Sequence, residues 1–393
     1  MFHFGEQFDF AMTILAGVSL ALTLAVFFLA VFTDRMIRKV RELPLPEVSF
    51  KLPRVSLVAP ARNEERNIER AVRTLLTLDY PDLQITLVND RSTDQTGKIL
   101  DRLAGENPRM NVVHLTELPS GWLGKNHAMQ VGADRSDGQW LLFTDADVFF
   151  EPTTLKRTIR YALENQVDHL VGSPDTRMPS WLLKCFVVTF GLNFLIFVRA
   201  WAIRNPRSSA HVGIGAFNLV RAEVFHAIGG MQPIAMRPDD DIKLGKLIKL
   251  QGYRQDLVSG IGGMIVVEWY SSIREMMLGL EKNMFAVLEY RLSAAVFFSV
   301  MMIVFNLWPF VAPLLTTGWA RGLYLADILC LLIMMLGVAR GTGNPLSCAL
   351  GYPLAMMLFL FIQWRAIFLT YWRGGIQWRD TRYSLAELRA NRI

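Results

Sequence analysis

The sequence has few charged residues: they make up 19% of its 393 positions, whereas hydrophobic residues make up 52%. This balance excludes an ordinary soluble protein and predicts membrane segments. The formal net charge is +6. A basic balance beside apolar segments favours contact with anionic lipid and argues against nucleic acid as a partner.

Cysteine is also scarce. Cys185, Cys330 and Cys348 all lie in apolar stretches, and none has the Cys-x-x-Cys spacing. We therefore expect neither a disulfide framework nor a structural zinc site.

The first apolar segment covers residues 10–32, which is long enough to span a bilayer. It lacks the usual small-residue cleavage site, so we interpret residues 1–42 as an uncleaved transmembrane anchor. Glu6 and Asp9 precede the segment, and basic residues follow it: Arg35, Arg38, Lys39 and Arg41. The positive-inside rule then predicts a protein of the inner (cell) membrane with the following domain in the cytoplasm.

The C-terminal part predicts further membrane segments. An amphipathic region over 264–292 is expected at the membrane surface, followed by membrane segments within 293–372 and a basic tail over 373–393. Three crossings, however, would place the tail outside, although its arginines favour the inside. Either one segment is re-entrant or interfacial, or the tail is external.

Residues 43–263 have the pattern of an α/β domain. Strand candidates at 55–59 and 84–88 alternate with amphipathic helix candidates at 68–78 and 96–103. This order predicts parallel strands joined by right-handed crossovers. Ligands of such Rossmann-like sheets bind outside the carboxyl ends of the strands.

Polar residues follow three of the expected strands: Asn63 and Glu64, Asp90 and Asp94, and Asp145 and Asp147. Because the carboxyl ends of parallel strands meet at one edge, we expect these side chains to converge on one rim.

Asp145 and Asp147 are one residue apart, so an extended chain places both carboxylates on the same side. Two like charges at that distance are costly unless a cation neutralises them. Mg²⁺ typically takes one or two carboxylates together with substrate phosphates. The pair predicts a metal–diphosphate clamp, although a turn with two solvated carboxylates has the same spacing.

Three motifs in order resemble glycosyltransferase family 2, whose members have the GT-A fold. They are Val-x-Leu-Val-x-Pro-Ala-Arg-Asn-Glu-Glu, Val-Asn-Asp-Arg-Ser-Thr-Asp and Thr-Asp-Ala-Asp. The resemblance covers roughly residues 54–260. It implies an α/β GT-A domain flanked by N- and C-terminal transmembrane helices.

The resemblance also implies roles for individual residues. Ala61, Asn63 and Glu64 would line the nucleotide-sugar site, and Asp90 would bond the base. Asp145 and Asp147 would bind the diphosphate through Mg²⁺ or Mn²⁺. A turn residue or a helix N-cap is the alternative for Asp90.

Gly124 and Lys125 precede a helix candidate, where backbone N–H groups and a point charge can bind phosphate. The stretch is similar to one in lipid-directed family members, in which the lysine reaches the diphosphate. A solvated lysine at a helix start is the alternative.

The sequence Asp240-Asp241-Ile242-Lys243-Leu244-Gly245 resembles the family pattern Glu-Asp-x-x-Leu-Gly, with Asp in place of Glu. The resemblance implies that Asp241 is the general base, with Asp240 as the second choice. One base without an enzyme nucleophile predicts single displacement with inversion. An acidic helix N-terminus is the alternative.

The apolar stretch 181–203 lies between the expected site residues. A single crossing there would separate them, so we predict an interfacial helix, with a buried helix as the alternative. Four stretches together resemble the ceramide, hopanoid-associated and carotenoid glycosyltransferase groups: Trp-Leu-Gly-Lys, Thr-Asp-Ala-Asp-Val, Asp-Asp-x-x-Leu-Gly and the C-terminal Trp-Arg-Asp-Thr-Arg-Tyr. This resemblance implies a UDP-hexose donor and a membrane lipid acceptor. The oligomeric state is not predicted.

Two other functions stay open. A processive polysaccharide synthase is disfavoured because the acceptor motif of such relatives, rich in Arg and ending in Trp, is missing near residue 270. Its nearest counterpart is Arg379-Asp380-Thr381-Arg382-Tyr383, which we expect to be part of a solvated basic tail. A non-catalytic membrane scaffold would have lost the acidic residues, and all are present.

Overall fold

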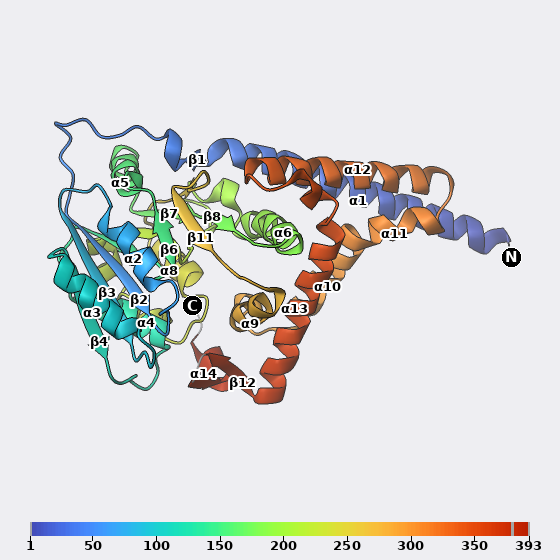
Figure 1. Ribbon diagram of the computed structural model, residues 1–393. Helices are drawn as coiled ribbons and strands as arrows, with labels where there is room; N and C mark the ends of the chain where they lie inside the picture. The colour runs from blue at the N-terminus through green and yellow to red at the C-terminus, as the bar shows by residue number, and fades with distance from the viewer. Residues whose placement is uncertain (1, 379–380, 392–393) are drawn as a thin grey trace. The chain divides into compact units, whose positions relative to one another are not determined.

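The computed structural model describes residues 2–378 and 381–391. It divides into two compact units. The sheet unit comprises residues 37–177, 198–269 and 377–393, and the helical unit comprises residues 1–36, 178–197 and 270–376. Figure 1 labels many of their helices and strands and colours the chain from the N-terminus to the C-terminus.

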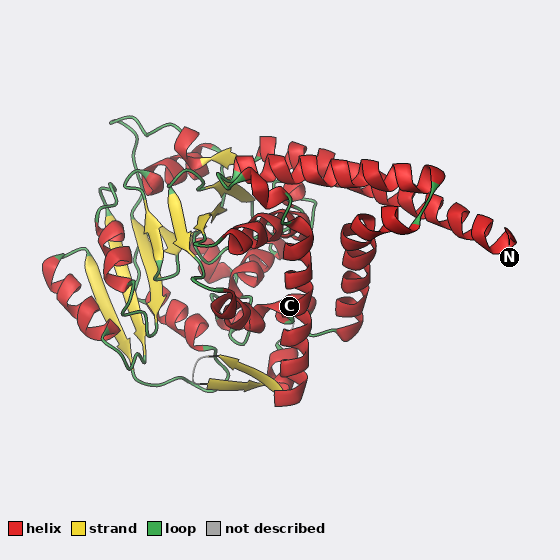
Figure 2. Cartoon of the chain, turned by 45° about the vertical axis from the view of Figure 1, so that its right-hand side comes forward, coloured by secondary structure: helices red, strands yellow, loops and turns green. Residues whose placement is uncertain are grey.

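The sheet unit contains an eight-stranded sheet in the order β1-β10-β7-β9-β5-β2-β3-β4. Its strands run side by side in Figure 2. Their bounds are β1 (Arg38–Lys39), β2 (Val55–Ala61), β3 (Leu83–Asp90), β4 (Met110–Leu115), β5 (Trp140–Phe143), β7 (His169–Ser173), β9 (Asn218–Arg221) and β10 (Gln255–Ser259). The predicted α/β class is confirmed.

Most neighbouring strands are parallel, as the strand–helix order predicts. The exception is β9, which pairs antiparallel with both β5 and β7. Phe143 at the end of β5 therefore lies opposite Asn218 at the start of β9. The segment that precedes β9 is thereby brought to the carboxyl edge of the parallel strands.

Smaller strands complete the sheet unit. A three-stranded sheet has the order β6-β11-β8, with β6 (Val148–Phe150), β11 (Ile265–Glu268) and β8 (Asp175–Arg177). Near the C-terminus, β12 (Gly375–Trp378) and β13 (Thr381–Ser384) form a two-stranded sheet.

Amphipathic helices cover the large sheet, and Figure 1 shows α3 and α4 along β3 and β4. In α2 the residues Ile68, Ala71, Val72 and Leu75 form one buried stripe, as a helical repeat of 3.6 residues requires. The helices of this unit are α2 (Ile68–Leu76), α3 (Thr96–Glu106), α4 (Gly124–Asp134), α5 (Thr154–Glu164), α7 (Ala222–Ala227), α8 (Asp240–Leu250) and α14 (Leu385–Ala390).

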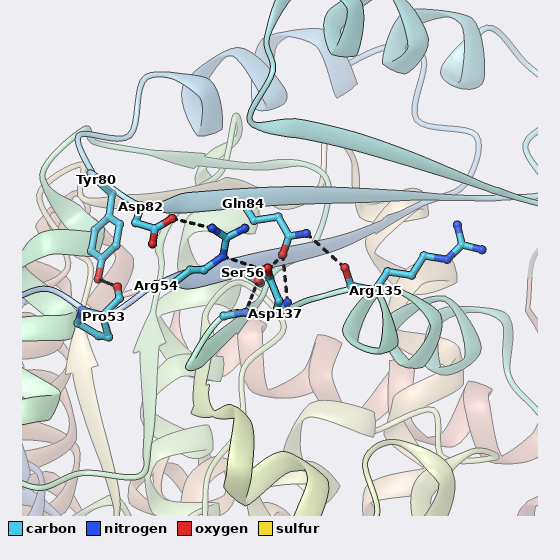
Figure 3. Close-up of polar contacts among 9 residues, drawn as sticks. Pro53, Arg54, Ser56, Tyr80, Asp82, Gln84, Arg135 and Asp137 are labelled. Carbon is cyan, nitrogen blue, oxygen red and sulfur yellow. Dashed lines mark hydrogen bonds and ion pairs between the residues drawn. The ribbon is translucent and has the colours of Figure 1, made fainter.

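The amino-terminal edge of β2 and β3 is held by matched polar pairs (Figure 3). Arg54 contacts Asp137 at 2.7 Å and Asp82 at 3.0 Å. The Ser56 hydroxyl donates to Gln84 at 2.5 Å. These contacts fix the relative register of the two strands and leave the opposite, carboxyl edge for other residues.

The helical unit contains five helical segments long and apolar enough to cross a membrane: Gln7–Met36, Trp181–Ala202, Leu292–Leu315, Gly318–Gly341 and Tyr352–Arg373, all within the described residues. The second extends past this unit at its end. The helices are α1 (Phe2–Met36), α6 (Trp181–Phe197), α9 (Ile273–Met284), α10 (Leu292–Met302), α11 (Trp308–Leu315), α12 (Gly318–Gly341) and α13 (Tyr352–Arg373).

Polar contacts join helices of this unit at buried positions. In α12, Asp327 is fully buried and accepts a hydrogen bond of 2.5 Å from Ser19 in α1. Figure 1 shows these two helices side by side. Glu281 in α9 binds Arg365 at 2.6 Å and Arg373 at 2.7 Å, both from α13. Carboxylates away from water need such partners.

Candidate active site

The carboxyl edge of the parallel strands carries the predicted site residues. Ala61 is the last residue of β2 and Asp90 the last of β3, and both are buried. Asp145 follows β5 by two residues. The loop 211–217 reaches the same edge because β9 is antiparallel to β5.

Asn63 and Glu64 lie in the turn after β2 and connect it to the turn after β3. The Asn63 Oδ1 atom accepts a hydrogen bond of 2.8 Å from the Thr93 N–H, and Asn63 has a left-handed φ of 53°. The Glu64 N–H donates to the Thr96 hydroxyl at 2.8 Å. Asn63 therefore holds two loops of the rim together, and its side chain is exposed.

Asp90 contacts two arginines. Its carboxylate binds the Arg91 Nε atom at 2.7 Å, and the Arg62 Nη1 atom lies 3.7 Å away. Gly124 is pressed against it, since an added Cβ would overlap the Asp90 Oδ2 atom. A nucleotide base that bonded Asp90 would share the carboxylate with Arg91.

Lys125 lies among the acidic side chains of the rim. Its Nζ atom is 2.8 Å from Asp145 Oδ1 and 3.3 Å from Asp240 Oδ2. Burial alone would lower the pKa of Lys125, but the charges of Asp145, Asp240 and Asp241 outweigh it and raise the pKa. The lysine is therefore a permanent internal cation.

Asp147 lies beside like charges. Burial raises the pKa of Asp147 to about 7, and the charges of Asp145 and Glu64 act in the same direction. Such crowding of carboxylates is the condition that a cation relieves.

The donor set at this rim suits a divalent ion shared with a ligand. The described residues hold no group of three or more His, Cys, Asp or Glu side chains that could bind a metal alone. Asp145 and Asp147 supply two carboxylates, and Mg²⁺ commonly takes its other ligands from phosphates and water. The residues thus fit a metal that arrives with a diphosphate.

The three aspartates at the start of α8 have different environments. Asp239 is buried and forms a bidentate ion pair with Arg237, in which each of the two hydrogen bonds is 2.8 Å long. Asp240 faces Lys125. Asp241 accepts hydrogen bonds from the Gly215 N–H at 2.9 Å and the Ile242 N–H at 2.8 Å.

The pKa of Asp241 lies in the range that suits a general base near neutral pH. Burial raises its pKa to about 7, with the charge of Asp240 adding to the effect and that of Lys125 opposing it. A general base is most effective when its pKa lies near the working pH.

Gly215 is a residue whose individual role the sequence did not predict. Its N–H binds Asp241, its carbonyl accepts a 3.0 Å hydrogen bond from the Asp145 N–H, and an added Cβ would lie 2.5 Å from Asp145 Oδ2. The backbone of this one residue thereby connects Asp145 to Asp241, the expected base. The stretch 211–217, with Gly213 and Gly215, is rich in glycine, which permits a close approach of backbone.

The expectation of a solvated tail is wrong for Tyr383 but holds for Arg382, which is exposed. Arg379 and Asp380 lie outside the described residues. Tyr383 is 7% exposed and Leu388 fully buried. Burial raises the pKa of Tyr383, and bonding to Thr381 and to the Gly124 backbone opposes the rise.

The tail also contacts the segment before α8. The Asn391 side chain donates to the Pro233 carbonyl at 2.9 Å and accepts from the Met236 N–H at 3.2 Å. The Ser384-Leu385-Ala386-Glu387 spacing forms a capping box for α14, a signal that the sequence displays.

A comparison with protein-family models identifies the family of residues 56–229. Residues 56–229 match the model of glycosyl transferase family 2. The chain carries a family 2 glycosyltransferase domain. The resemblance of its three motifs is thereby confirmed.

Curated relatives extend the match by different lengths. A 4,4'-diaponeurosporenoate glycosyltransferase of Staphylococcus aureus is 21% identical over 88% of this chain and 92% of that protein. A beta-monoglucosyldiacylglycerol synthase of Synechocystis is 35% identical over 28% of this chain and 23% of that protein. The chain spans between about a quarter and a third of the length of two further relatives.

A solved structure has the same fold. The mannosyltransferase PcManGT from Pyrobaculum calidifontis, in complex with GDP-Man and Mn²⁺, superimposes with a TM-score of 0.53 at 17% identity. The match covers 90% of this chain and 99% of that one. The predicted GT-A fold is thereby confirmed.

Proposed function

We propose that the protein transfers a sugar from a nucleotide-diphosphate sugar to a hydroxyl or carboxyl group of a membrane lipid. The transfer is a single displacement with inversion, with Asp241 as the general base. The observation that carries this proposal is that Asp241, a carboxylate with a pKa of about 7, accepts a hydrogen bond from the N–H of Gly215, whose carbonyl binds the Asp145 N–H.

The donor diphosphate binds beside Lys125. The lysine supplies positive charge at the start of α4, where the N-cap residue Leu123 makes no side-chain hydrogen bond and the Gly124 backbone bonds Tyr383. The other N–H groups of the first turn have no partner within the helix, so they can bind phosphate oxygens. Asp145 and Asp147 would hold Mg²⁺ or Mn²⁺, which would neutralise the leaving diphosphate.

Asp241 removes the proton of an acceptor hydroxyl as the new glycosidic bond forms. Its two backbone hydrogen bonds hold the carboxylate in one orientation. A carboxyl acceptor is already ionised at neutral pH and needs no such base. The charge that develops on the sugar ring faces the carboxylate-rich rim, which stabilises a cationic transition state.

The lipid acceptor is supported by two observations. Within the described part of the chain, five helical segments are long and apolar enough to cross a membrane. The relatives' names refer to diaponeurosporenoate and diacylglycerol. A UDP-hexose is the donor that we propose to test first, with GDP-mannose second because PcManGT was solved with it.

The sheet unit lies in the cytoplasm in this proposal. The chain segments that make up this unit restrict the membrane topology. Residues 198–269 and 377–391 belong to the same unit, so the chain between them crosses the membrane an even number of times. One of the three apolar segments is then not a full crossing. The best candidate is 292–315, which a π-helical turn at Ile303–Leu307 and Pro313 interrupt. By the same reasoning, the segment 181–203 lies at the surface.

The test is mass spectrometry of membrane lipids from cells with and without the gene, combined with an assay of nucleotide release from UDP-hexoses and GDP-mannose in those membranes. We expect a hexose increment on one lipid class. A long polymer as the product would contradict the lipid acceptor. Absence of turnover with all donors would contradict the enzymatic proposal as a whole and favour a scaffold.

A further inference from the structure

Three polar side chains form a chain of hydrogen bonds in the interior of the large sheet, behind the rim. His169 in β7, Asn218 in β9 and Gln255 in β10 are 0%, 3% and 2% exposed. The His169 Nε2 atom lies 3.1 Å from Asn218 Oδ1, and its Nδ1 atom lies 3.1 Å from Gln255 Nε2.

The partners determine which nitrogen of His169 carries the proton. Asn218 Oδ1 can only accept, so Nε2 is protonated, and Gln255 Nε2 can only donate, so Nδ1 is not. The imidazole must then be neutral. Burial agrees with this state because it lowers the pKa of His169 to about 4.

Each end of this chain contacts one of the two segments that meet at Asp241. Asn218 Oδ1 also accepts a hydrogen bond of 3.4 Å from the Ile214 N–H, next to Gly215. Gln255 Nε2 also donates to the Gly245 carbonyl, one helical turn after Asp241. The network therefore holds the loop and the helix at the same time.

The loop and the helix are in backbone contact, so small shifts matter. A Cβ at Gly213 would overlap the Asp241 carbonyl, and a Cβ at Gly245 would overlap the Val212 carbonyl. The nearest atoms at both points are backbone atoms, which cannot rotate away as a flexible side chain can when the loop shifts against α8.

Stability alone does not account for these side chains. Gln255 Oε1 is buried without a hydrogen-bond partner, which costs free energy. Apolar side chains of similar size would fill the same space without that cost. The cost of burying these polar groups is accounted for if their hydrogen bonds fix the orientation of the Asp241 side chain.

We propose that His169, Asn218 and Gln255 are positioning residues that orient the Asp241 carboxylate through the loop 211–217 and helix α8. This inference rests on the proposed role of Asp241. The polar interior of the sheet is in this view part of the machinery for the reaction, although it does not touch the substrate.

The first test compares His169→Phe with His169→Gln in membranes that contain the full chain, using the sugar nucleotide that the wild type consumes. Phe removes both hydrogen bonds, whereas Gln keeps a donor toward Asn218. We expect kcat to fall about tenfold or more for Phe and less for Gln, with the donor KM within twofold of wild type. Equal kcat in all three proteins overturns the proposal.

Tyr161→Phe is the matched control. The Tyr161 hydroxyl donates to Asp256 at 2.6 Å, next to Gln255 in β10 but without contact to the base. We expect its kcat to match wild type. Parallel losses of kcat, donor affinity and thermal stability in Tyr161→Phe and both His169 variants indicate a merely structural role and overturn the proposal.

A second readout does not depend on activity. Hydrogen–deuterium exchange of the purified full chain reports the Gly215 N–H, which donates to Asp241. We expect faster exchange over 211–217 in both His169 variants and unchanged exchange over 83–90. If exchange over 211–217 is the same in the His169 variants as in the wild type, the positioning role of the network is overturned, even when the wild type shows turnover. A wild type without turnover contradicts the proposed function and leaves the exchange result to decide the network.

Discussion

The two edges of the large sheet differ in how their charged side chains are paired. At the amino-terminal edge, Arg54 is matched by Asp82 and Asp137, and all three side chains are at least 39% exposed (Figure 3). At the carboxyl edge, four carboxylates interact with Lys125, and two of them have a pKa raised to about 7. Matched exposed pairs only hold strands in register. Crowded carboxylates cost stability and are retained where chemistry uses them.

The largest effect is expected from Asp241→Asn, which removes the base and keeps its shape. Loss of a general base typically lowers the rate by about 10² to 10⁴-fold, so we expect kcat for a hydroxyl acceptor to fall by that factor. Asp137→Asn at the opposite edge is the control and should leave kcat unchanged. Equal rates for wild type and Asp241→Asn would remove Asp241 as the base.

The pH dependence of the reaction should follow the ionisation of Asp241. Its pKa of about 7 means that the carboxylate is lost as pH falls below that value. We therefore expect kcat/KM to fall about tenfold per pH unit below 7 and to level off above it. A profile that stays flat down to pH 5 contradicts an Asp base with a raised pKa.

Asp147→Asn should stabilise the protein at high pH. The folded-state pKa of about 7 lies above the ordinary value of 3.8, so the folded state disfavours the charged form. The penalty is absent below the ordinary value, grows as pH rises toward 7 and then stays constant, reaching at most about 4 kcal/mol. Thermal unfolding in detergent without metal should show a gain for Asp147→Asn at pH 8 and none at pH 4. A loss at pH 8 would contradict the crowding of charges.

Lys125→Met removes the cation that the carboxyl edge shares. A charge-assisted contact to the diphosphate is worth about 1.5–3 kcal/mol, which corresponds to roughly 10 to 100-fold in affinity. We expect the donor KM to rise by that factor, measured by nucleotide release in membranes. An unchanged KM would mean that Lys125 only balances the aspartates.

The smallest effect is expected at the matched edge. Arg54→Ala breaks two exposed ion pairs, which are each worth about 0.2–1 kcal/mol. We expect a small fall in the unfolding temperature and unchanged turnover. A large loss of turnover would end the contrast between the two edges.

The parallel part of the fold could be predicted from the sequence because local patterns specify it. Alternating apolar residues in β2 enter opposite cores, as with Leu57 and Val58, and the stripe of α2 has the helical repeat. The antiparallel placement of β9 has no local signal. It depends on pairing with β5, whose partners lie more than 70 residues away.

The acidic residues of the site could be found in the sequence, but their division of labour could not. Asp239, Asp240 and Asp241 are identical in type, and only the partners Arg237, Lys125 and Gly215 distinguish them. The positions of Tyr383 and Asn391 were missed for a related reason. A short basic segment after an apolar helix has the composition of a solvated tail, and its tertiary contacts carry no periodic signal.

The packing of residues 381–391 into the sheet unit has a consequence for the order of synthesis. The ribosome makes these residues after the apolar helices that precede them, so the segment that contacts Gly124 and Met236 is synthesised after the rest of the sheet unit. A nascent chain that has not yet delivered its last apolar helix lacks this segment. The sheet unit can therefore be completed only after the last apolar helix has been synthesised.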